Sequence, residues 1–283
     1  MIPQAVIHWL EANDFGEVTT SRYVGGGCIN QGTRLHTTSG DSFFLKTNTS
    51  TPPDMFEREA EGLEALNQVG GPRTPRPWLY GPDFILMEDL VPAPRAADYW
   101  RVFGRQLATL HNVTQPRFGF DHDNYIGSTP QPNEWTPDGY QFFAEQRLLY
   151  QARLAVRQGL MTGKVAAQVE HLSARLPDLV PQQPASLLHG DLWSGNAITD
   201  AGGGPAVIDP AAHYGWAEAE LAMTALFGSF PEVFYRAYQE VRPLDKGFTE
   251  RFALYNLYHL LNHLNLFGSG YLGQVMSILH YYQ

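Results

Sequence analysis

Three polar side chains in one short stretch of this chain have the types and spacing needed to transfer a phosphoryl group. Asp191 follows a His-Gly pair, Asn196 stands five positions later, and Asp209 ends a short apolar run. In phosphoryl-transfer enzymes the same order supplies a catalytic base, a metal-binding amide and a metal-binding carboxylate. The alternative is an ordinary hairpin with Asp and Asn in its turns. Because that alternative leaves the agreement of all three offsets unexplained, we favour a phosphoryl-transfer site.

The elements around these residues would bring the two metal-binding candidates together. Residues 197–199 and 205–208 are predicted to be short strands, and the Asp-Ala-Gly-Gly-Gly stretch between them permits a tight turn. Antiparallel pairing places the start of the first strand beside the end of the second, with the strands about 5 Å apart. Asn196 and Asp209 flank these points, so we expect them to share a Mg²⁺ ion, which prefers oxygen ligands. Asp191 remains free to accept a proton from a hydroxyl group.

The whole chain has the composition of an ordinary globular protein. Its 283 residues are 43% hydrophobic and 17% charged, enough to bury a large core in one large or two medium domains. The net charge of −10 argues against nucleic acid as a partner, because nucleic-acid binders normally carry a basic stripe. The sequence has no leader-like start, no apolar run long enough to cross a bilayer and a single cysteine. It therefore predicts a cytoplasmic protein without membrane contact or internal disulfides.

The predicted secondary structure changes from mainly strands to mainly helices near residue 90. Two Pro-rich stretches, 70–77 and 92–94, bracket a predicted strand over 84–87. Strand-like segments predominate before these stretches, and helical segments predominate after them. This asymmetry predicts an α+β fold with a small β-rich lobe over residues 1–90 and a large, mainly helical lobe over residues 91–283.

Candidate nucleotide contacts lie in the predicted small lobe. Gly25, Gly26 and Gly27 lie between two predicted strands, where glycines let backbone N–H groups approach phosphates, although a flexible hairpin would look the same. No helix follows them, which argues against a Walker A or Rossmann loop. Lys46 ends an apolar strand, where an ammonium group needs a partner. Glu59, on the inward face of the next predicted helix, is the candidate partner, and the pair would direct the lysine toward the α- and β-phosphates. The alternative is a surface lysine and an unrelated glutamate on the helix face.

The strand over 84–87 runs into the linker between the predicted lobes. In the phosphoryl-transfer template, adenine binds at this position through main-chain groups, so the main-chain atoms of Glu88 and Leu90 are the expected contacts. The polar, aromatic segment 118–127 in the large lobe is of a kind that often carries recognition.

Helical periodicity predicts the main elements of the large lobe, over residues 100–111, 141–158, 219–227 and 252–267. His111, at the end of the first, is interpreted as a capping or core histidine. Glu218 and Glu220, at the acidic start of the third, are expected to favour the helix dipole. His259 and His263 lie one turn apart and could bind zinc, but no third ligand is evident, so a hydrogen-bonded core or a substrate contact is preferred.

These motifs resemble those of the fructosamine kinase (ketosamine-3-kinase) family, within the protein-kinase-like fold shared with aminoglycoside phosphotransferases. The His-Gly-Asp core is generic to small-molecule kinases, whereas Leu-Trp-Ser-Gly-Asn at 192–196 and Asp-Pro-Ala at 209–211 are typical of this family. The resemblance covers nearly the full length, with further matching segments at 25–30, 55–63, 118–127, 214–215, 221–223 and 258–263.

The resemblance implies ATP-dependent phosphorylation of the 3-hydroxyl of a ketosamine. The phosphorylated product sheds its sugar, so the activity would repair glycated amines. Asp191 would orient and deprotonate the sugar hydroxyl, and Asn196 and Asp209 would hold Mg²⁺. Trp193 would stack on the sugar or on an amine-bearing face, and His263 is a second candidate substrate contact. The acceptor would be a small-molecule ketosamine or a glycated amine such as a protein lysine.

Two alternatives and two departures from the family pattern stay open. The chain could be a kinase for another hydroxylated amine, such as an aminoglycoside or a choline-like molecule, or, less in keeping with its complete residue set, a non-catalytic nucleotide-binding module. Glu220 stands where Asp is expected, so hydrogen bonds to the catalytic loop could be rearranged. Cys28 lies in the glycine loop, where it could form an intermolecular disulfide or merely pack. We therefore expect a monomer or a redox-dependent homodimer.

Overall fold

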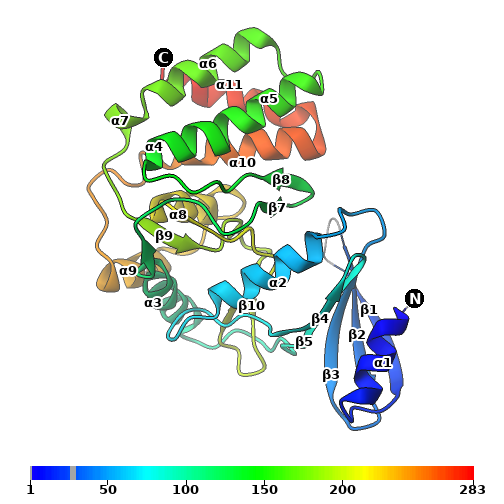
Figure 1. The fold of residues 1–283 in the computed structure, drawn as a ribbon. Coiled ribbons are helices and arrows are strands. Elements are labelled where there is room, and N and C mark those ends of the chain that lie inside the picture. Colours follow the sequence, from blue (N-terminus) through cyan, green and yellow to red (C-terminus); the bar gives the residue numbers. More distant parts are fainter. Residues whose placement is uncertain (1, 26–29) are drawn as a thin grey trace.

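A five-stranded antiparallel sheet forms one end of the molecule (Figure 1). The computed structural model describes residues 2–25 and 30–283. The strand order is β1-β2-β3-β5-β4. The strands are β1 (Val18–Val24), β2 (Gln31–Thr37), β3 (Ser42–Thr47), β4 (Pro77–Gly81) and β5 (Phe84–Glu88).

One helix covers each face of this sheet. α1 (Gln4–Ala12), which the sequence analysis did not predict, packs on the face that includes Phe43 and Leu45. α2 (Met55–Leu66) packs on the opposite face, with Phe44. Since successive side chains of a strand point to opposite faces, Lys46 shares the α2 face with Phe44. Burial on both faces explains why β3 reads as an almost continuous apolar run.

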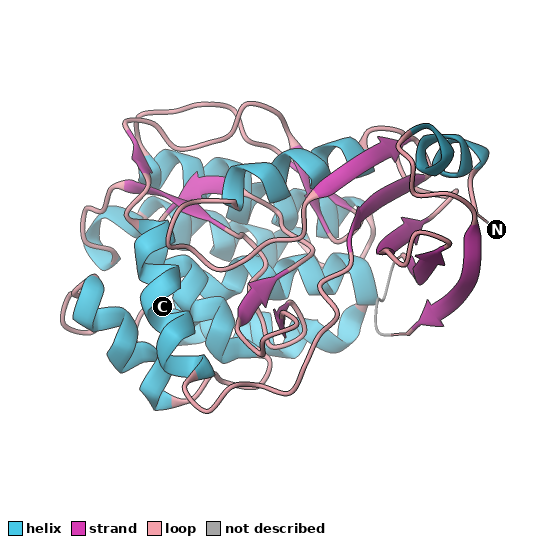
Figure 2. Ribbon diagram, turned by 90° about the horizontal axis from the view of Figure 1, so that it is seen from below, coloured by secondary structure: helices cyan, strands magenta, loops and turns pink. Residues whose placement is uncertain are grey.

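The large lobe is mainly helical, and its helices gather away from the sheet (Figures 1 and 2). They are α3 (Tyr99–His111), α4 (Gly139–Gln141), the π-helical η1 (Phe142–Leu149), α5 (Tyr150–Arg157), α6 (Gly163–Ala174), α7 (Leu176–Leu179), α8 (Ala217–Leu226), α9 (Glu232–Val241), α10 (Phe252–Phe267), the 3₁₀ turn η2 (Ser269–Tyr271) and α11 (Leu272–Tyr281). α10 has the predicted bounds and packs against α5, α8 and α11. The predicted helix over 141–158 is instead α4, η1 and α5 in succession.

Short strands complete the large lobe. They are β6 (Thr114–Gln115), β7 (Asn124–Ile126), β8 (Thr129–Gln131), β9 (Ala185–Leu188), β10 (Ala197–Thr199), β11 (Pro205–Val207) and β12 (His213–Gly215). They form the sheets β12-β9-β6, β10-β11 and β7-β8. None of the helices among the described residues is long and apolar enough to cross a membrane. Strands predominate up to Glu88 and helices begin again at Tyr99, as expected, while a domain boundary at residue 90 remains a prediction.

Candidate active site

Two loops of the large lobe are hydrogen-bonded to each other and carry the predicted chemistry. The first, 189–196, joins β9 to β10, and the second, 208–212, joins β11 to β12. The ring of His189 lies 2.8 Å from the carbonyl oxygen of Ile208, whose N–H donates to the carbonyl oxygen of Asn196 at 3.2 Å. The hairpin β10-β11 pairs antiparallel, as expected. The backbones of Asn196 and of the residue before Asp209 therefore adjoin.

Gly190 allows the close approach of the two loops. Its φ is +85°, and a Cβ atom built on it would lie 2.1 Å from the carbonyl oxygen of Ala211. Any side chain at this position would force the loops apart, which gives the glycine of the His-Gly-Asp motif a steric reason. Asp209 is also in the left-handed region, with a φ of +58°, which Asp tolerates better than most residues.

Asp191 has the surroundings of a proton acceptor. Asn196 Nδ2 donates to the Asp191 carbonyl oxygen at 2.8 Å and lies 3.3 Å from its Oδ2. Burial, reinforced by the charges of Asp209 and Glu220 and opposed by the hydrogen bond from Asn196, raises the pKa of Asp191 to about 7. A carboxylate with a raised pKa is a better base than an ordinary one.

The predicted pair between Lys46 and Glu59 is confirmed. Lys46 Nζ lies 2.5 Å from Glu59 Oε1 and also contacts Oδ1 of Asp209, a contact that the sequence analysis did not foresee. Burial lowers the pKa of Lys46, but the two carboxylates outweigh it, and the net pKa lies above the usual value. The lysine is therefore charged, and it links the small lobe to the loop that carries Asp209.

Glu220 lies in the first turn of α8, as predicted, but its carboxylate also makes specific hydrogen bonds. One of its carboxylate oxygens accepts from the N–H of Gly190 at 2.6 Å, and the other accepts from the N–H of His189 at 3.0 Å. His111 Nε2 lies 2.9 Å from the same second oxygen, so the prediction of a core histidine is confirmed. Burial raises the pKa of Glu220, but hydrogen bonds from His111 and from the loop N–H of Gly190 outweigh it and lower the net pKa. The longer Glu side chain thus holds the catalytic loop directly.

Glu218 is likewise more than a dipole partner. It makes a bidentate pair with Arg251, at 2.6 and 2.7 Å, and accepts a hydrogen bond from Tyr255 at 3.0 Å. Glu218 lies in the first turn of α8, as expected, and it has these additional partners for the same reason as Glu220: the start of α8 is buried, and a buried carboxylate needs specific partners.

An aromatic group lies beside the catalytic loop. Trp193 makes an edge-on contact with Phe227, at 6.4 Å between ring centroids, and Phe227 lies 4.5 Å from the ring of His263. A Cβ atom at Gly195 would lie 2.4 Å from the Trp193 ring, so the glycine lets the indole lie over the loop. The structure therefore connects the two predicted substrate contacts through Phe227. Sequence reasoning missed Phe227 because nothing local distinguishes it from a core phenylalanine. His263 Nδ1 lies 2.8 Å from the carbonyl oxygen of His259, as a hydrogen-bonded core histidine would.

The predicted adenine contacts lie at the end of β5. The backbone N–H of Glu88 donates to the carbonyl oxygen of Arg76 at 2.8 Å, so this donor is not available to a nucleotide. Within the described residues, the N–H of Leu90 makes no hydrogen bond and is free to donate.

The glycine loop is only partly described. Gly25, exposed at the end of β1, belongs to the described residues. Gly26, Gly27 and Cys28 lie outside them. The phosphate-binding loop and the redox-dependent homodimer through Cys28 accordingly stay predictions.

Comparisons with known proteins agree with this geometry. A sequence model of the fructosamine kinase family matches residues 2–282. A probable ketoamine kinase from Synechocystis is 44% identical over 263 residues, covering 91% of this chain and 88% of that protein. The chloroplastic protein-ribulosamine 3-kinase of Arabidopsis thaliana is 42% identical over 276 residues, covering 94% of this chain and 83% of that protein.

Solved structures show the same relationship. The crystal structure of a Thermobifida fusca protein assigned as a fructosamine-3-kinase has a TM-score of 0.89 at 32% identity, covering 100% of this chain and 99% of the other. Choline kinase LicA from Streptococcus pneumoniae shares the fold, with a TM-score of 0.65 at 15% identity over 99% of this chain and 98% of the other. The resemblance inferred from the motifs is therefore confirmed: the chain has the two-lobe protein-kinase-like fold and belongs to the fructosamine kinase family, whose members are phosphotransferases.

Proposed function

We propose that this protein transfers the γ-phosphoryl group of ATP to the 3-hydroxyl of a ketosamine, which then sheds its sugar and frees the amine. One observation carries the proposal: Asp191 and Trp193 lie two residues apart on one loop, with Phe227 and His263 extending the aromatic surface. A carboxylate that accepts a proton and an aromatic face that stacks on a sugar are what such an acceptor requires. The names of the relatives from Synechocystis and Arabidopsis support the same acceptor class.

The described residues divide the work of the reaction. Asp191 accepts the proton of the sugar hydroxyl while the hydroxyl oxygen attacks the γ-phosphorus of ATP and ADP leaves. Lys46 contacts the phosphate oxygens of ATP, and Glu59 keeps the lysine oriented for that contact. Trp193 and His263 hold the acceptor. Each role is inferred from the charge and the contacts of the side chain concerned.

Main-chain groups bind the rest of the nucleotide in this proposal. The N–H of Leu90 and the carbonyl of Glu88 would pair with adenine, since the N–H of Glu88 is already bonded to Arg76. The loop of Gly25, Gly26 and Gly27 would cover the phosphates.

The side chains of Asn196 and Asp209 fit a Mg²⁺ ion through the chemistry of their donor atoms. Because Asn196 Nδ2 donates to Asp191, the Oδ1 atom of Asn196 is left to bind a cation, and Asp209 adds a carboxylate. Among the described residues, no group of three or more His, Cys, Asp or Glu could hold a metal ion by itself. Magnesium sites with one or two protein ligands and substrate phosphates are common. When bound, the ion would neutralise charge on the transferring phosphate.

Mass spectrometry tests the proposed acceptor. Fructosyl-lysine, ribulosyl-lysine and a glycated peptide are each incubated with the protein, ATP and Mg²⁺. We expect a gain of one phosphate followed by loss of the sugar, and the three arms rank the sugar and the size of the acceptor. Aminoglycoside and choline arms test the alternative acceptors. Phosphorylation of these, with no reaction of any ketosamine, would contradict the proposal.

The substitution Asp191→Asn tests the catalytic base. We expect kcat to fall by at least about 100-fold, because the amide cannot accept the hydroxyl proton. Nucleotide affinity should change little, since the proposed nucleotide contacts lie elsewhere. ADP release and titration with a fluorescent nucleotide measure the two quantities separately. Unchanged turnover in this variant would remove Asp191 from the reaction.

A further inference from the structure

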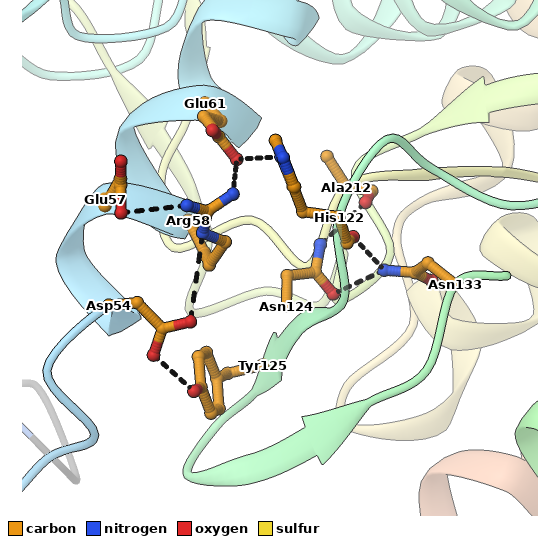
Figure 3. Close-up of polar contacts among 9 residues, drawn as sticks. All are labelled: Asp54, Glu57, Arg58, Glu61, His122, Asn124, Tyr125, Asn133 and Ala212. Atoms are coloured by element: carbon orange, nitrogen blue, oxygen red, sulfur yellow. Dashed lines mark hydrogen bonds and ion pairs between the residues drawn. The ribbon is translucent and has the colours of Figure 1, made fainter.

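Side chains of a loop in the large lobe are hydrogen-bonded to residues of helix α2 and its N-terminus (Figure 3). The same helix carries Glu59. This loop contains the hairpin β7-β8 and lies far from α2 in the sequence. Residues 118–127, which open it, were expected to carry recognition. Several of its polar side chains, including Asn124, Gln131 and Asn133, are buried and point into the protein. Their contacts indicate a different role.

Buried hydrogen bonds fix the loop to the catalytic part of the large lobe. Asn124 Nδ2 donates to the carbonyl oxygen of Ala212 at 2.8 Å, three residues after Asp209. Gln131 Nε2 donates to Asn124 Oδ1 at 2.7 Å, and Tyr258 on α10 donates to Gln131 Oε1 at 2.6 Å. Buried polar groups that are fully paired are rigid. The loop is therefore a fixed point relative to the residues that carry the chemistry.

Two side-chain contacts join α2 to this loop. Tyr125 Oη donates to Asp54 Oδ1 at 2.7 Å, at the start of the helix. His122 Nδ1 lies 3.2 Å from Glu61 Oε2, and Glu61 is itself held by Arg58 at 2.7 Å. Figure 3 shows these side chains meeting between the helix and the loop. Burial and Asp54 raise the pKa of Tyr125 to about 12, so the phenol remains a donor.

The two residues that the loop holds, Asp54 and Glu61, lie on either side of Glu59 along the chain. Asp54 precedes Glu59 and Glu61 follows it, so a helix held at both points can neither rotate nor slide without breaking one contact. The helix also lies close to the loop after Asp209, because a Cβ atom at Gly62 would be 3.2 Å from Cγ of Pro210. The position of Glu59, and through it that of Lys46, is therefore coupled to the large lobe.

We propose that Tyr125 and His122 are positioning residues, which hold α2 so that Glu59 directs Lys46 toward the nucleotide. The inference rests on the proposed function, since it assumes the phosphate-binding role of Lys46. The loop would then affect the binding of ATP, the phosphoryl donor. A role in substrate recognition would instead affect the binding of the ketosamine, the phosphoryl acceptor.

The substitution Tyr125→Phe removes one hydroxyl group and tests the inference. We expect the KM for ATP to rise about three- to tenfold and kcat to fall, with the KM for the ketosamine unchanged. His122→Ala, at a side chain that is largely exposed, should show the same pattern with a smaller size. Tyr80→Phe is the matched control, because Tyr80 is an exposed tyrosine of the small lobe whose hydroxyl group makes no hydrogen bond to another described residue. Its kinetics should equal those of the wild type.

A double substitution separates positioning from a general structural effect. If Tyr125 acts through Glu59, then Tyr125→Phe should add nothing to the KM for ATP in a Glu59→Gln background. Effects that multiply in the double variant would overturn the inference, as would unchanged kinetics of Tyr125→Phe or a rise in the ketosamine KM alone. If Glu59→Gln itself left ATP kinetics unchanged, the proposed role of the lysine pair would fail, which is a different result.

Discussion

Glu220 holds the main chain of the catalytic loop through two hydrogen bonds. Its two oxygens accept the N–H groups of His189 and Gly190, and His111 lies against the same carboxylate. An amide at this position would turn its NH₂ group toward one of these donors. A shorter side chain would lose reach toward either the loop or His111. The length and the charge of Glu220 both matter.

The substitution Glu220→Gln should therefore reduce both stability and turnover. We expect the free energy of unfolding to fall by about 3 kcal/mol, because a buried donor loses its acceptor. We also expect kcat to fall about tenfold or more, because the N–H groups beside Asp191 are no longer held. Urea unfolding and initial rates measure these effects.

A matched control lies two residues away in the same helix. Glu218→Gln breaks a comparable buried pair with Arg251, which lies outside the catalytic loop. We expect it to lose stability while the turnover per folded molecule is kept. Equal losses of turnover in both variants would show that the loop does not depend on Glu220 in particular.

At the scale of elements, the approach of the two active-site loops depends on Gly190. Gly190→Ala puts a Cβ atom into the carbonyl oxygen of Ala211 and strains a left-handed backbone as well. Gly159→Ala carries similar backbone strain, with a φ of +72°, but its Cβ meets nothing within 4 Å. We expect a loss of about 1 kcal/mol for Gly159→Ala from strain alone, and a clearly larger loss with impaired turnover for Gly190→Ala. Denaturant unfolding of both variants checks this, and equal losses would contradict the steric argument.

The elements that the sequence predicted are those with a strong local pattern. An apolar run identified β3 and left Lys46 as a charged group in need of a partner, and helical spacing placed Glu59 on the inward side of α2, so their pairing followed. The turn glycines identified the β10-β11 hairpin. A π-helix such as η1 has no such signature, because its side chains do not repeat at a spacing that differs clearly from an α-helix over eight residues.

At the scale of the whole molecule, the contacts that the sequence did not predict join distant segments. The bond from Tyr125 to Asp54 spans 71 positions, and that from His111 to Glu220 spans 109. Neither partner carries a local signal for the other. Phe227 contacts both Trp193 and His263 because the end of α8 reaches α10. Such contacts follow from how helices, strands and loops pack together, which periodicity along the chain does not specify.

The packing of the large lobe also determines how stability depends on pH. His111, His189, His213 and His259 are buried, and burial lowers the pKa of each, to about 3 for His259. Below pH 6.5 the unfolded chain therefore binds protons that the folded chain does not, so the free energy of unfolding falls as the pH falls. For His259, with its pKa of about 3, this loss is about 1 kcal/mol between pH 7 and 5.5.

Replacing one buried histidine tests this dependence for the whole molecule. His259→Gln removes a group that must stay neutral, so its unfolding free energy should depend less steeply on pH, by up to about 1.4 kcal/mol per pH unit below 6.5. His171→Gln, at an exposed position on α6, is the matched substitution and should keep the slope of the wild type. Urea unfolding at several pH values between 7 and 5 gives the three slopes. Equal slopes for His259→Gln and the wild type would mean that His259 is protonated in the folded protein as readily as in the unfolded chain, and that water reaches its ring.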